Sequence, residues 1–171
     1  LPIFQAAGGT ATAFKADVSQ SNQVKQLFDY TIQTYGKIDV LINNAGIMCF
    51  KKIEGLDDET IESVLSINLK GTLYTMREAA KRLEQGGKII NLSSSVIAMK
   101  LEGYGIYTAS KAAIESLTAI LAKELRGKQI TVNAIAPGPT ATATAWKSMA
   151  GWPASRAERS PPMAMPSTGC A

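Results

Sequence analysis

Short apolar runs alternate along this chain with longer segments whose apolar residues recur at helical spacing. The short runs are typical of strands and span Ile38–Ile42, Lys88–Leu92 and Ile130–Ile135, with an alternating run at Thr10–Ala16. The helical segments span Ser21–Tyr35, Asp57–Glu84 and Tyr104–Arg126. A strand–helix–strand alternation predicts a parallel sheet covered by helices. We therefore expect an α/β fold, a doubly wound parallel sheet in a three-layer α/β/α arrangement.

Polar residues and glycines follow the predicted strands at the point where each strand ends. They are Asp17, the Asn43-Asn44-Ala45-Gly46 run, Ser94 and the Pro137-Gly138 pair. The carboxyl ends of parallel strands meet at one edge of a sheet, where such folds bind their ligands. The sequence therefore predicts one site at this edge. A plain turn remains open for the Asn-Gly run, because Asn and Gly also favour turns.

Tyr107 and Lys111 lie four residues apart in a predicted helix, on one face and about 6 Å apart along its axis. A free tyrosine has a pKa of about 10 and is a poor base at neutral pH. A fixed ammonium beside it favours the phenolate and lowers that pKa. With a hydroxyl from Ser94 to bind a carbonyl, these side chains suit proton transfer at a carbonyl or an alcohol. The alternative is a surface tyrosine beside a solvated lysine, and Ser93 and Ser95 are neighbours of Ser94.

The composition excludes several other chemistries. The 171 residues include no histidine, which removes Ser-His-Asp catalysis and histidine metal sites. The two cysteines, Cys49 and Cys170, form no ligand pair or disulfide framework, which favours a reducing, cytoplasmic environment. No apolar run reaches the roughly 18 residues of a transmembrane helix. The net charge of +4 forms no basic stripe. We expect no metal, no nucleic acid and no membrane as partners.

Six motifs occur in the order and spacing of one family: Asp17-Val18, the Asn43–Gly46 run, Asn68, Ser94, Tyr107 with Lys111, and Pro137-Gly138. Over about Thr10–Thr140 the chain resembles the classical short-chain dehydrogenases/reductases. The resemblance implies a Rossmann-type fold and hydride transfer between a nicotinamide cofactor and a ketone or secondary alcohol. It implies NADP or NAD as cofactor, with NADP slightly favoured, and a homodimer or homotetramer. Family members act on acyl-carrier thioesters, sugars, steroids and quinones.

The resemblance also implies catalytic roles for four residues. Tyr107 is the acid/base, and Lys111 lowers its pKa and holds the nicotinamide ribose. Ser94 orients the substrate oxygen. Asn68 holds a water that connects to the lysine as a proton relay. Asn68 also falls on the apolar stripe of its helix, so a buried amide satisfied by backbone groups is the alternative.

Cofactor contacts are implied by the same resemblance. Asp17 and Val18 lie against the adenine, although Asp17 is also a candidate N-cap of the next helix. The other implied contacts are Asn44, Ala45 and Gly46 beside the cofactor, Tyr107 and Lys111 at the ribose, and Pro137, Gly138, Thr140 and Thr142 over the nicotinamide. Within this last segment, Pro139 departs from the family pattern.

Parts of the family pattern are absent from the sequence. It contains no Thr-Gly-x-x-x-Gly-x-Gly turn to hold a pyrophosphate, and the first strand, first helix and second strand are missing with it. Residues 141–171 contain no Leu, Ile, Val, Phe or Tyr and four of the seven prolines, a composition typical of disorder. We expect a partial NAD(P)-binding domain at 1–140, incomplete at both ends, and an atypical disordered tail at 141–171. The alternative is a non-catalytic fragment or scaffold that dimerises through its two long helices.

Overall fold

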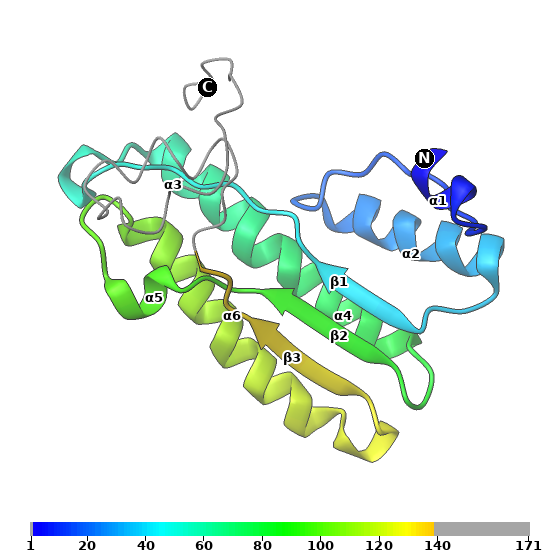
Figure 1. Cartoon of the computed structure of the whole chain (residues 1–171). Helices are drawn as coiled ribbons and strands as arrows, with labels where there is room; N and C mark the ends of the chain where they lie inside the picture. Colours follow the sequence, from blue (N-terminus) through cyan, green and yellow to red (C-terminus); the bar gives the residue numbers. More distant parts are fainter. Residues whose placement is uncertain (1, 139–171) are drawn as a thin grey trace.

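A computed structural model describes residues 2–138, and the side chains of residues 4–138 (Figure 1). The helices are α1 (Pro2–Ala6), α2 (Ser21–Tyr35), α3 (Asp58–Val64), α4 (Thr72–Arg82), α5 (Val96–Met99) and α6 (Gly105–Glu124). The strands are β1 (Val40–Asn43), β2 (Lys88–Leu92) and β3 (Thr131–Ile135). A π-helical segment, η2 (Leu65–Gly71), joins α3 to α4, and two single 3-10 turns are η1 (Ile53–Gly55) and η3 (Arg126–Lys128). The predicted bounds of α2 and β2 are confirmed to the residue.

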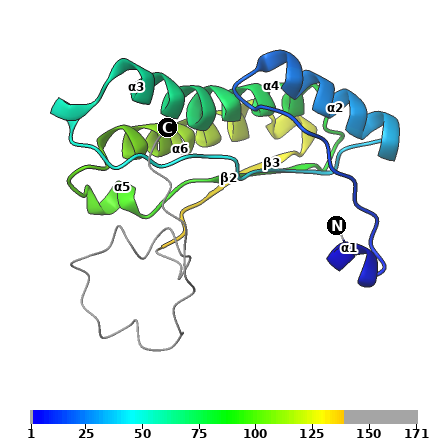
Figure 2. The ribbon, with the colours of Figure 1, turned by 90° about the horizontal axis from the view of Figure 1, so that it is seen from above.

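The three strands form one parallel sheet in the order β1-β2-β3. The register places Leu41 beside Ile89 and Ile89 beside Val132. Figure 2 shows α2, α4 and α6 together on one face of this sheet. The expected parallel sheet packed against helices is thereby confirmed. The described residues supply two of the three expected layers, as an incomplete sheet of three strands.

The hydrophobic core lies between the sheet and these helices. Its buried members are Val24, Phe28, Met76, Ala79, Leu83, Ile89, Leu125, Ile130 and Val132. Side chains alternate between the two faces of a strand, so Ile89 and Val132, neighbours in register, point to the same side. Burying one such aliphatic side chain contributes about 1.5–3 kcal/mol. The half-buried Leu117, Leu121 and Ala122 of α6 pack against this core, which fixes the helix that carries Tyr107.

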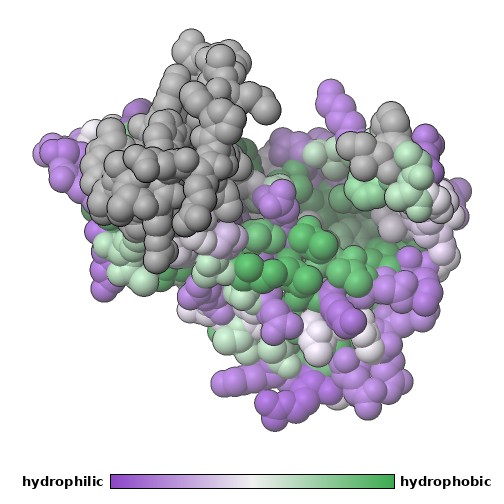
Figure 3. Space-filling model, viewed as in Figure 1, coloured by the Kyte–Doolittle hydropathy of each residue, from purple (hydrophilic) through white to green (hydrophobic). Residues whose placement is uncertain are grey.

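The opposite face of the sheet is apolar and open within the described residues. Val40, Ile42 and Ile135 are 47%, 60% and 49% exposed, and Ile90 and Leu92 lie half-buried between them. We call these five residues the open sheet face. Figure 3 shows hydrophobic side chains gathered across the middle of the molecule in the same view. Parallel sheets are normally covered on both faces, so a three-layer fold carries its second set of helices at this position.

The alternating run Thr10–Ala16 forms no strand, which corrects the prediction from its pattern. Its backbone has no ladder partner among the described residues, and a single extended segment gains little without one. Its side chains contact α2 instead. The Thr12 hydroxyl lies 2.9 Å from the Tyr35 hydroxyl, and the rings of Phe14 and Tyr30 have centroids 5.0 Å apart.

The long helix predicted at Asp57–Glu84 is divided by the wider π-helical turns of η2. It begins as expected at Asp57, whose carboxylate accepts a 2.7 Å bond from the Thr60 N–H and thereby caps α3. Gly71 ends η2 at a close approach to a neighbouring segment, because a Cβ there would lie 2.9 Å from Val18 Cγ2. This contact fixes the turn after residue 16 against the helix. A π-helical turn is frequent at functional sites, and η2 carries Asn68.

A row of side-chain hydrogen bonds crosses the helix-covered face of the sheet. The Thr75 hydroxyl lies 2.7 Å from Asn43 Oδ1, and Asn43 Nδ2 donates a 2.8 Å bond to Asn91 Oδ1. Asn91 Nδ2 in turn donates a 2.8 Å bond to the Thr118 hydroxyl. We call these four residues the polar ladder. It joins α4, β1, β2 and α6, and it satisfies amide groups that burial would otherwise leave unpaired.

Candidate active site

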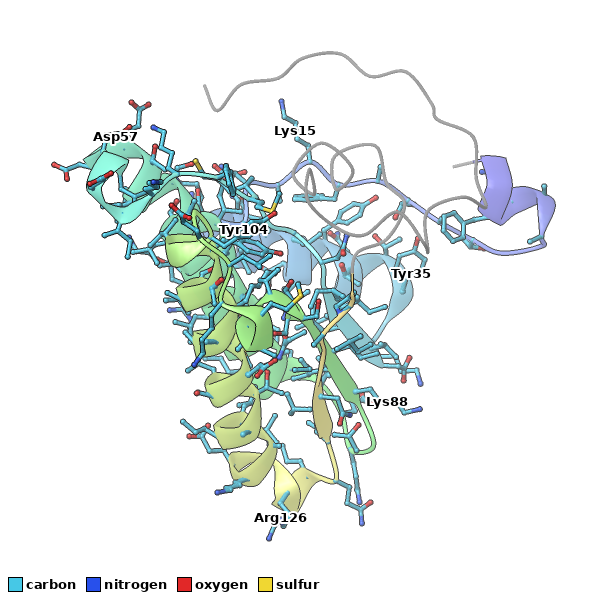
Figure 4. The ribbon with its side chains drawn as sticks, turned by 60° about the vertical axis from the view of Figure 1, so that its left-hand side comes forward. Lys15, Tyr35, Asp57, Lys88, Tyr104 and Arg126 are labelled. Atoms are coloured by element: carbon cyan, nitrogen blue, oxygen red, sulfur yellow. The ribbon has the colours of Figure 1, made fainter. Side chains whose placement is uncertain are left out.

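A pocket of about 260 Å³ opens at the carboxyl ends of the strands. It is lined by Asn44, Gly46, Ile47, Met48, Leu92, Ser93, Ser94, Tyr107, Lys111, Pro137 and Gly138. These residues come from the end of β2, from the loops after all three strands and from the first two turns of α6. Figure 4 shows Tyr104, just before α6, at the far end of the sheet from Lys88 and Arg126. The edge of the sheet at which the sequence predicted a site is therefore hollowed.

Lys111 is buried beneath this pocket, with 5% of the residue exposed. Its Nζ donates a 2.7 Å bond to the Leu92 carbonyl oxygen and lies 5.8 Å from the centroid of the Tyr107 ring. Burial lowers the pKa of Lys111 below its ordinary value of 10.5, because desolvation disfavours the ammonium. No carboxylate among the described side chains forms an ion pair with it. The alternative of a solvated lysine is therefore wrong.

The three neighbouring serines differ in their surroundings. Ser93 is 4% exposed, and its hydroxyl donates a 2.7 Å bond to Glu115 Oε1. Ser94 is half-buried, and its Oγ accepts only a long 3.4 Å bond from the Val96 N–H. Ser93 and Ser94 line the pocket and Ser95 does not. Within residues 4–138, no acceptor takes the Ser94 hydroxyl proton, so that proton is available to a ligand.

Asn68 lies behind the pocket and is fully buried. Its Oδ1 accepts a 2.8 Å bond from the Ile47 N–H, and its Nδ2 donates to the Ile47 carbonyl at 2.8 Å and to the Ser110 hydroxyl at 3.2 Å. A Cβ on Gly46 would lie 3.3 Å from Asn68 Oδ1 and 3.6 Å from Lys111 Nζ. The Asn68 side chain is thus satisfied by protein groups, and it fixes the loop that forms one wall of the pocket.

The remaining predicted cofactor residues are distributed unequally. Asn44, Gly46, Pro137 and Gly138 line the pocket. Ala45 and Val18 line a separate small hollow beside Gly71 and Thr75. Thr140 and Thr142, like the predicted tail at 141–171, lie outside the described residues.

Asp17 sits in an exposed turn before α2 rather than at the helix N-cap. The N-cap is Gln20, which makes no side-chain capping bond. The Asp17 carboxylate accepts a 2.9 Å bond from the Ser19 N–H. The N-cap alternative for Asp17 is therefore wrong, because the turn places it three residues too early.

Sequence reasoning missed several residues that shape the pocket. The Leu92 carbonyl anchors Lys111, and Ile47 and Met48 form an apolar wall. Glu115 was missed as well, although it stands four residues after Lys111 and so shares its helix face. The carbonyl carried no sequence signal, because every residue has one.

A family model described as short chain dehydrogenase matches residues 3–151 of the chain. The chain belongs to this family. It is 48% identical over 139 residues to a short-chain type dehydrogenase/reductase of Picea abies, covering 79% of the chain and 51% of that protein. It is 44% identical over 133 residues to an Arabidopsis thaliana protein named NADPH-dependent aldehyde reductase 2, chloroplastic, covering 75% of the chain and 49% of that protein.

Solved structures of the same family are similar in fold. A putative dehydrogenase from Burkholderia cenocepacia with bound NADP aligns with a TM-score of 0.82 at 31% identity, over 86% of this chain and 56% of that one. A dehydrogenase/reductase from Sinorhizobium meliloti 1021 aligns with a TM-score of 0.77 at 34% identity, over 81% of this chain and 55% of that one. The chain spans about half the length of the relatives that it matches.

Two further observations concern the described residues alone. No helix there combines the length and the apolar character that a membrane crossing requires. No three or more Cys, Asp or Glu side chains gather in residues 2–138 in a way that suits a metal ion.

Proposed function

We propose that the protein carrying this chain transfers hydride between NADP(H) or NAD(H) and a ketone or secondary alcohol. The observation that carries the proposal is the convergence of Ser94, Tyr107 and the buried Lys111 on one pocket. When bound, the nicotinamide supplies or accepts the hydride at the carbonyl carbon. Membership of the short-chain dehydrogenase family supports the same reaction class.

The chain's own groups account for the proton and the substrate oxygen. The Ser94 hydroxyl, whose proton no described acceptor takes, donates to the carbonyl oxygen of the substrate. During reduction Tyr107 Oη gives its proton to that oxygen, and during oxidation it takes the proton back. The Lys111 ammonium stabilises the resulting charge on Tyr107 Oη. The Leu92 carbonyl holds this ammonium in place.

The pocket fits the nicotinamide-ribose end of such a cofactor. Lys111 Nζ has three N–H donors, and one of them reaches the Leu92 carbonyl, which leaves donors for ribose hydroxyls. Gly46 leaves space on this side of the pocket, since a Cβ there would lie 3.3 Å from Asn68 Oδ1 and 3.6 Å from Lys111 Nζ. We assign Asn68 to a water-mediated proton relay that leads to Lys111, in addition to its support of this wall. We assign cofactor contact to Asp17, Val18, Asn44, Ala45, Pro137, Gly138, Thr140 and Thr142. The NADPH in the Arabidopsis relative's name and the NADP in the Burkholderia structure favour NADP.

Replacing Tyr107 with phenylalanine tests the proposed function. The variant should lose turnover while it retains cofactor affinity, because the ring still packs and only the proton donor is gone. The assay follows oxidation of NADPH and NADH with a panel of ketones, using a full-length form that supplies the glycine-rich turn. Tyr35→Phe, at a 43% exposed tyrosine, is the matched control. Activity of Tyr107→Phe within about tenfold of the parent, or roughly 1.4 kcal/mol of barrier, would contradict the role.

A non-catalytic scaffold that dimerises through α4 and α6 is the second candidate. Leu73 on α4 and Ile120 on α6 are 38% and 52% exposed, an apolar surface on each of the two long helices. The same surface would support a homodimer or homotetramer of an active enzyme. Sedimentation velocity of Leu73→Lys and Ile120→Lys tests the contact, since loss of the dimer is expected. A scaffold is favoured only if a folded dimer shows no reductase activity with either cofactor.

A further inference from the structure

We propose that the carbonyl substrate is a neutral aryl ketone or aldehyde whose apolar part lies on a ledge beside the pocket. The apolar ledge consists of Ile47, Phe50, Ile53 and Leu101. This inference rests on the proposed hydride-transfer function and narrows its substrate class. It separates a neutral aromatic carbonyl from sugars and from acyl-carrier thioesters.

The ledge consists of four exposed large apolar side chains from the loops after β1 and before α6. Ile47, Phe50, Ile53 and Leu101 are 37%, 59%, 77% and 41% exposed. Ile47 also lines the pocket, so the ledge continues an apolar wall that already faces Tyr107. Exposed apolar groups that gather next to a polar pocket are typical of ligand sites.

Contacts between two loops hold the apolar ledge in a fixed arrangement. The Lys51 N–H donates a 3.0 Å bond to the Gly103 carbonyl, which joins the loop after β1 to the loop before α6. The rings of Phe50 and Tyr104 meet edge to face with centroids 5.3 Å apart. Gly103 has φ of 81°, and a Cβ there would lie 2.7 Å from Phe50 Cε2. Because the second loop leads directly into α6, Phe50 is held at a fixed position relative to Tyr107.

The charged side chains within residues 47–53 and 101–105 form ion pairs, whereas Glu54 and Lys100, which flank these residues, form none with the described side chains. Lys51 Nζ lies 2.6 Å from an Asp57 carboxylate oxygen, and Lys52 Nζ lies 2.8 Å from a Glu102 carboxylate oxygen. Residues 47–53 and 101–105 therefore present no charged side chain without an ion-pair partner. A charged group laid on this surface would lose hydration without gaining a counter-charge. The ledge consequently suits a neutral ligand.

The pocket formed by the described residues is small for a substrate and a nicotinamide together. About 260 Å³ is less than the roughly 300–1,000 Å³ of typical ligand pockets, and a nicotinamide would share it. The reacting carbonyl therefore fits inside, beside Ser94 and Tyr107, and the rest of the substrate extends past Ile47. The exposed ring of Phe50 then offers an aromatic surface for offset or edge-to-face packing.

Methyl NMR of the 171-residue chain labelled with ¹³C-methyl methionine tests this proposal. Met48 lines the pocket, and Met48→Leu identifies its signal. The probes are 2-acetylnaphthalene, its carboxylated analogue 6-acetyl-2-naphthoate, and dihydroxyacetone. We expect 2-acetylnaphthalene to shift the Met48 signal with a dissociation constant at least tenfold below those of the other two.

Variants of the ledge locate the binding. Phe50→Ser and Ile53→Ser should each weaken 2-acetylnaphthalene binding severalfold, and Phe50→Leu should weaken it less, because it stays apolar. Phe4→Ser, at a 59% exposed position on α1, should leave it unchanged. A response to Ile42→Ser in place of Phe50→Ser would show binding on the open sheet face and overturn the proposal.

The remaining outcomes are also decisive. Equal affinity for the naphthoate or for dihydroxyacetone would overturn the neutral aryl class, as would an unmoved Met48 signal in a chain whose methyl spectrum shows a folded core. NADPH turnover of the full-length form is measured separately. If reductase activity is absent while the ledge variants still alter 2-acetylnaphthalene binding, the proposed function fails and the ledge remains an aryl ketone site.

Discussion

Replacing Asn68 with alanine should lower the free energy of unfolding by about 3 kcal/mol. The buried amide makes three bonds, two with the backbone of Ile47 and one with the Ser110 hydroxyl. Each such bond contributes about 1 kcal/mol net, which gives the sum. Ile47 lies in a loop and is 37% exposed as a residue, so its segment lies close to solvent and we expect the loss to stay near this value. The variant should therefore fold, with a loosened pocket wall.

Urea unfolding followed by circular dichroism measures the loss, and hydrogen exchange of the Ile47 amide locates it. Asn68→Asp keeps an oxygen that accepts from the Ile47 N–H but removes both bonds that Asn68 Nδ2 donates. The Ile47 amide should therefore stay protected from exchange in Asn68→Asp and exchange faster in Asn68→Ala. Asn133→Ala, at an exposed position on β3, should change stability by less than about 0.5 kcal/mol. A loss below about 1 kcal/mol in Asn68→Ala, or a protected Ile47 amide in that variant, would refute the reasoning.

Three further predictions follow from the site and the fold. Burial lowers the pKa of Lys111 below 10.5 in the folded chain. Between the lowered pKa and 10.5 the unfolded chain therefore binds more protons than the folded one, and the free energy of unfolding should rise with pH. Urea unfolding over a pH series should show this rise in the parent chain and not in Lys111→Met. Gly71→Ala should lower the free energy of unfolding by about 1–3 kcal/mol, because its Cβ would lie 2.9 Å from Val18 Cγ2. Gly55→Ala is the control, because a Cβ at Gly55 meets no atom within 4 Å. Equal thermal midpoints of the two variants would argue against the contact. The 171-residue chain should bind NADPH weakly, since its sequence lacks the glycine-rich turn that cradles a pyrophosphate; calorimetry giving a low micromolar constant, near −8 kcal/mol, would exclude this.

The spacing of apolar residues predicted a helix or strand correctly where the element packs against other described residues. The apolar period of Ser21–Tyr35 marks the face that α2 buries, and its ends match the prediction. The alternation of Thr10–Ala16 is equally clear, yet a strand also needs a neighbour to complete its hydrogen bonds, and a pattern does not reveal whether one is present. The π-helical break at η2 carried no Pro or Gly-pair signal, since its sequence from Leu65 to Gly71 contains no proline and a single glycine.

The candidate site was also predictable only in part: the side-chain motifs could be found in the sequence, but their partners in the folded chain could not. Side-chain motifs predicted Ser94, Tyr107 and Lys111 as neighbours, and all three line the pocket. The anchoring of Lys111 could not be predicted, because its acceptor is a backbone carbonyl. The family spacing favoured Ser94 over Ser93. The bond from the Ser93 hydroxyl to Glu115 could not be predicted, because Glu115 becomes a neighbour only once α6 packs on β2.

The polar ladder limits how this part of the chain is able to change over generations. Each amide in it is both donor and acceptor. A substitution at Asn91 alone therefore leaves Asn43 Nδ2 without its acceptor and removes the bond that the Thr118 hydroxyl accepts. Replacing linked members together by apolar groups of similar shape leaves fewer unpaired atoms than the single steps do. Whether a substitution at one of these four positions is tolerated therefore depends on which of the other positions have already changed. We expect strong epistasis among these positions, with viable variants differing at two or more of them at once.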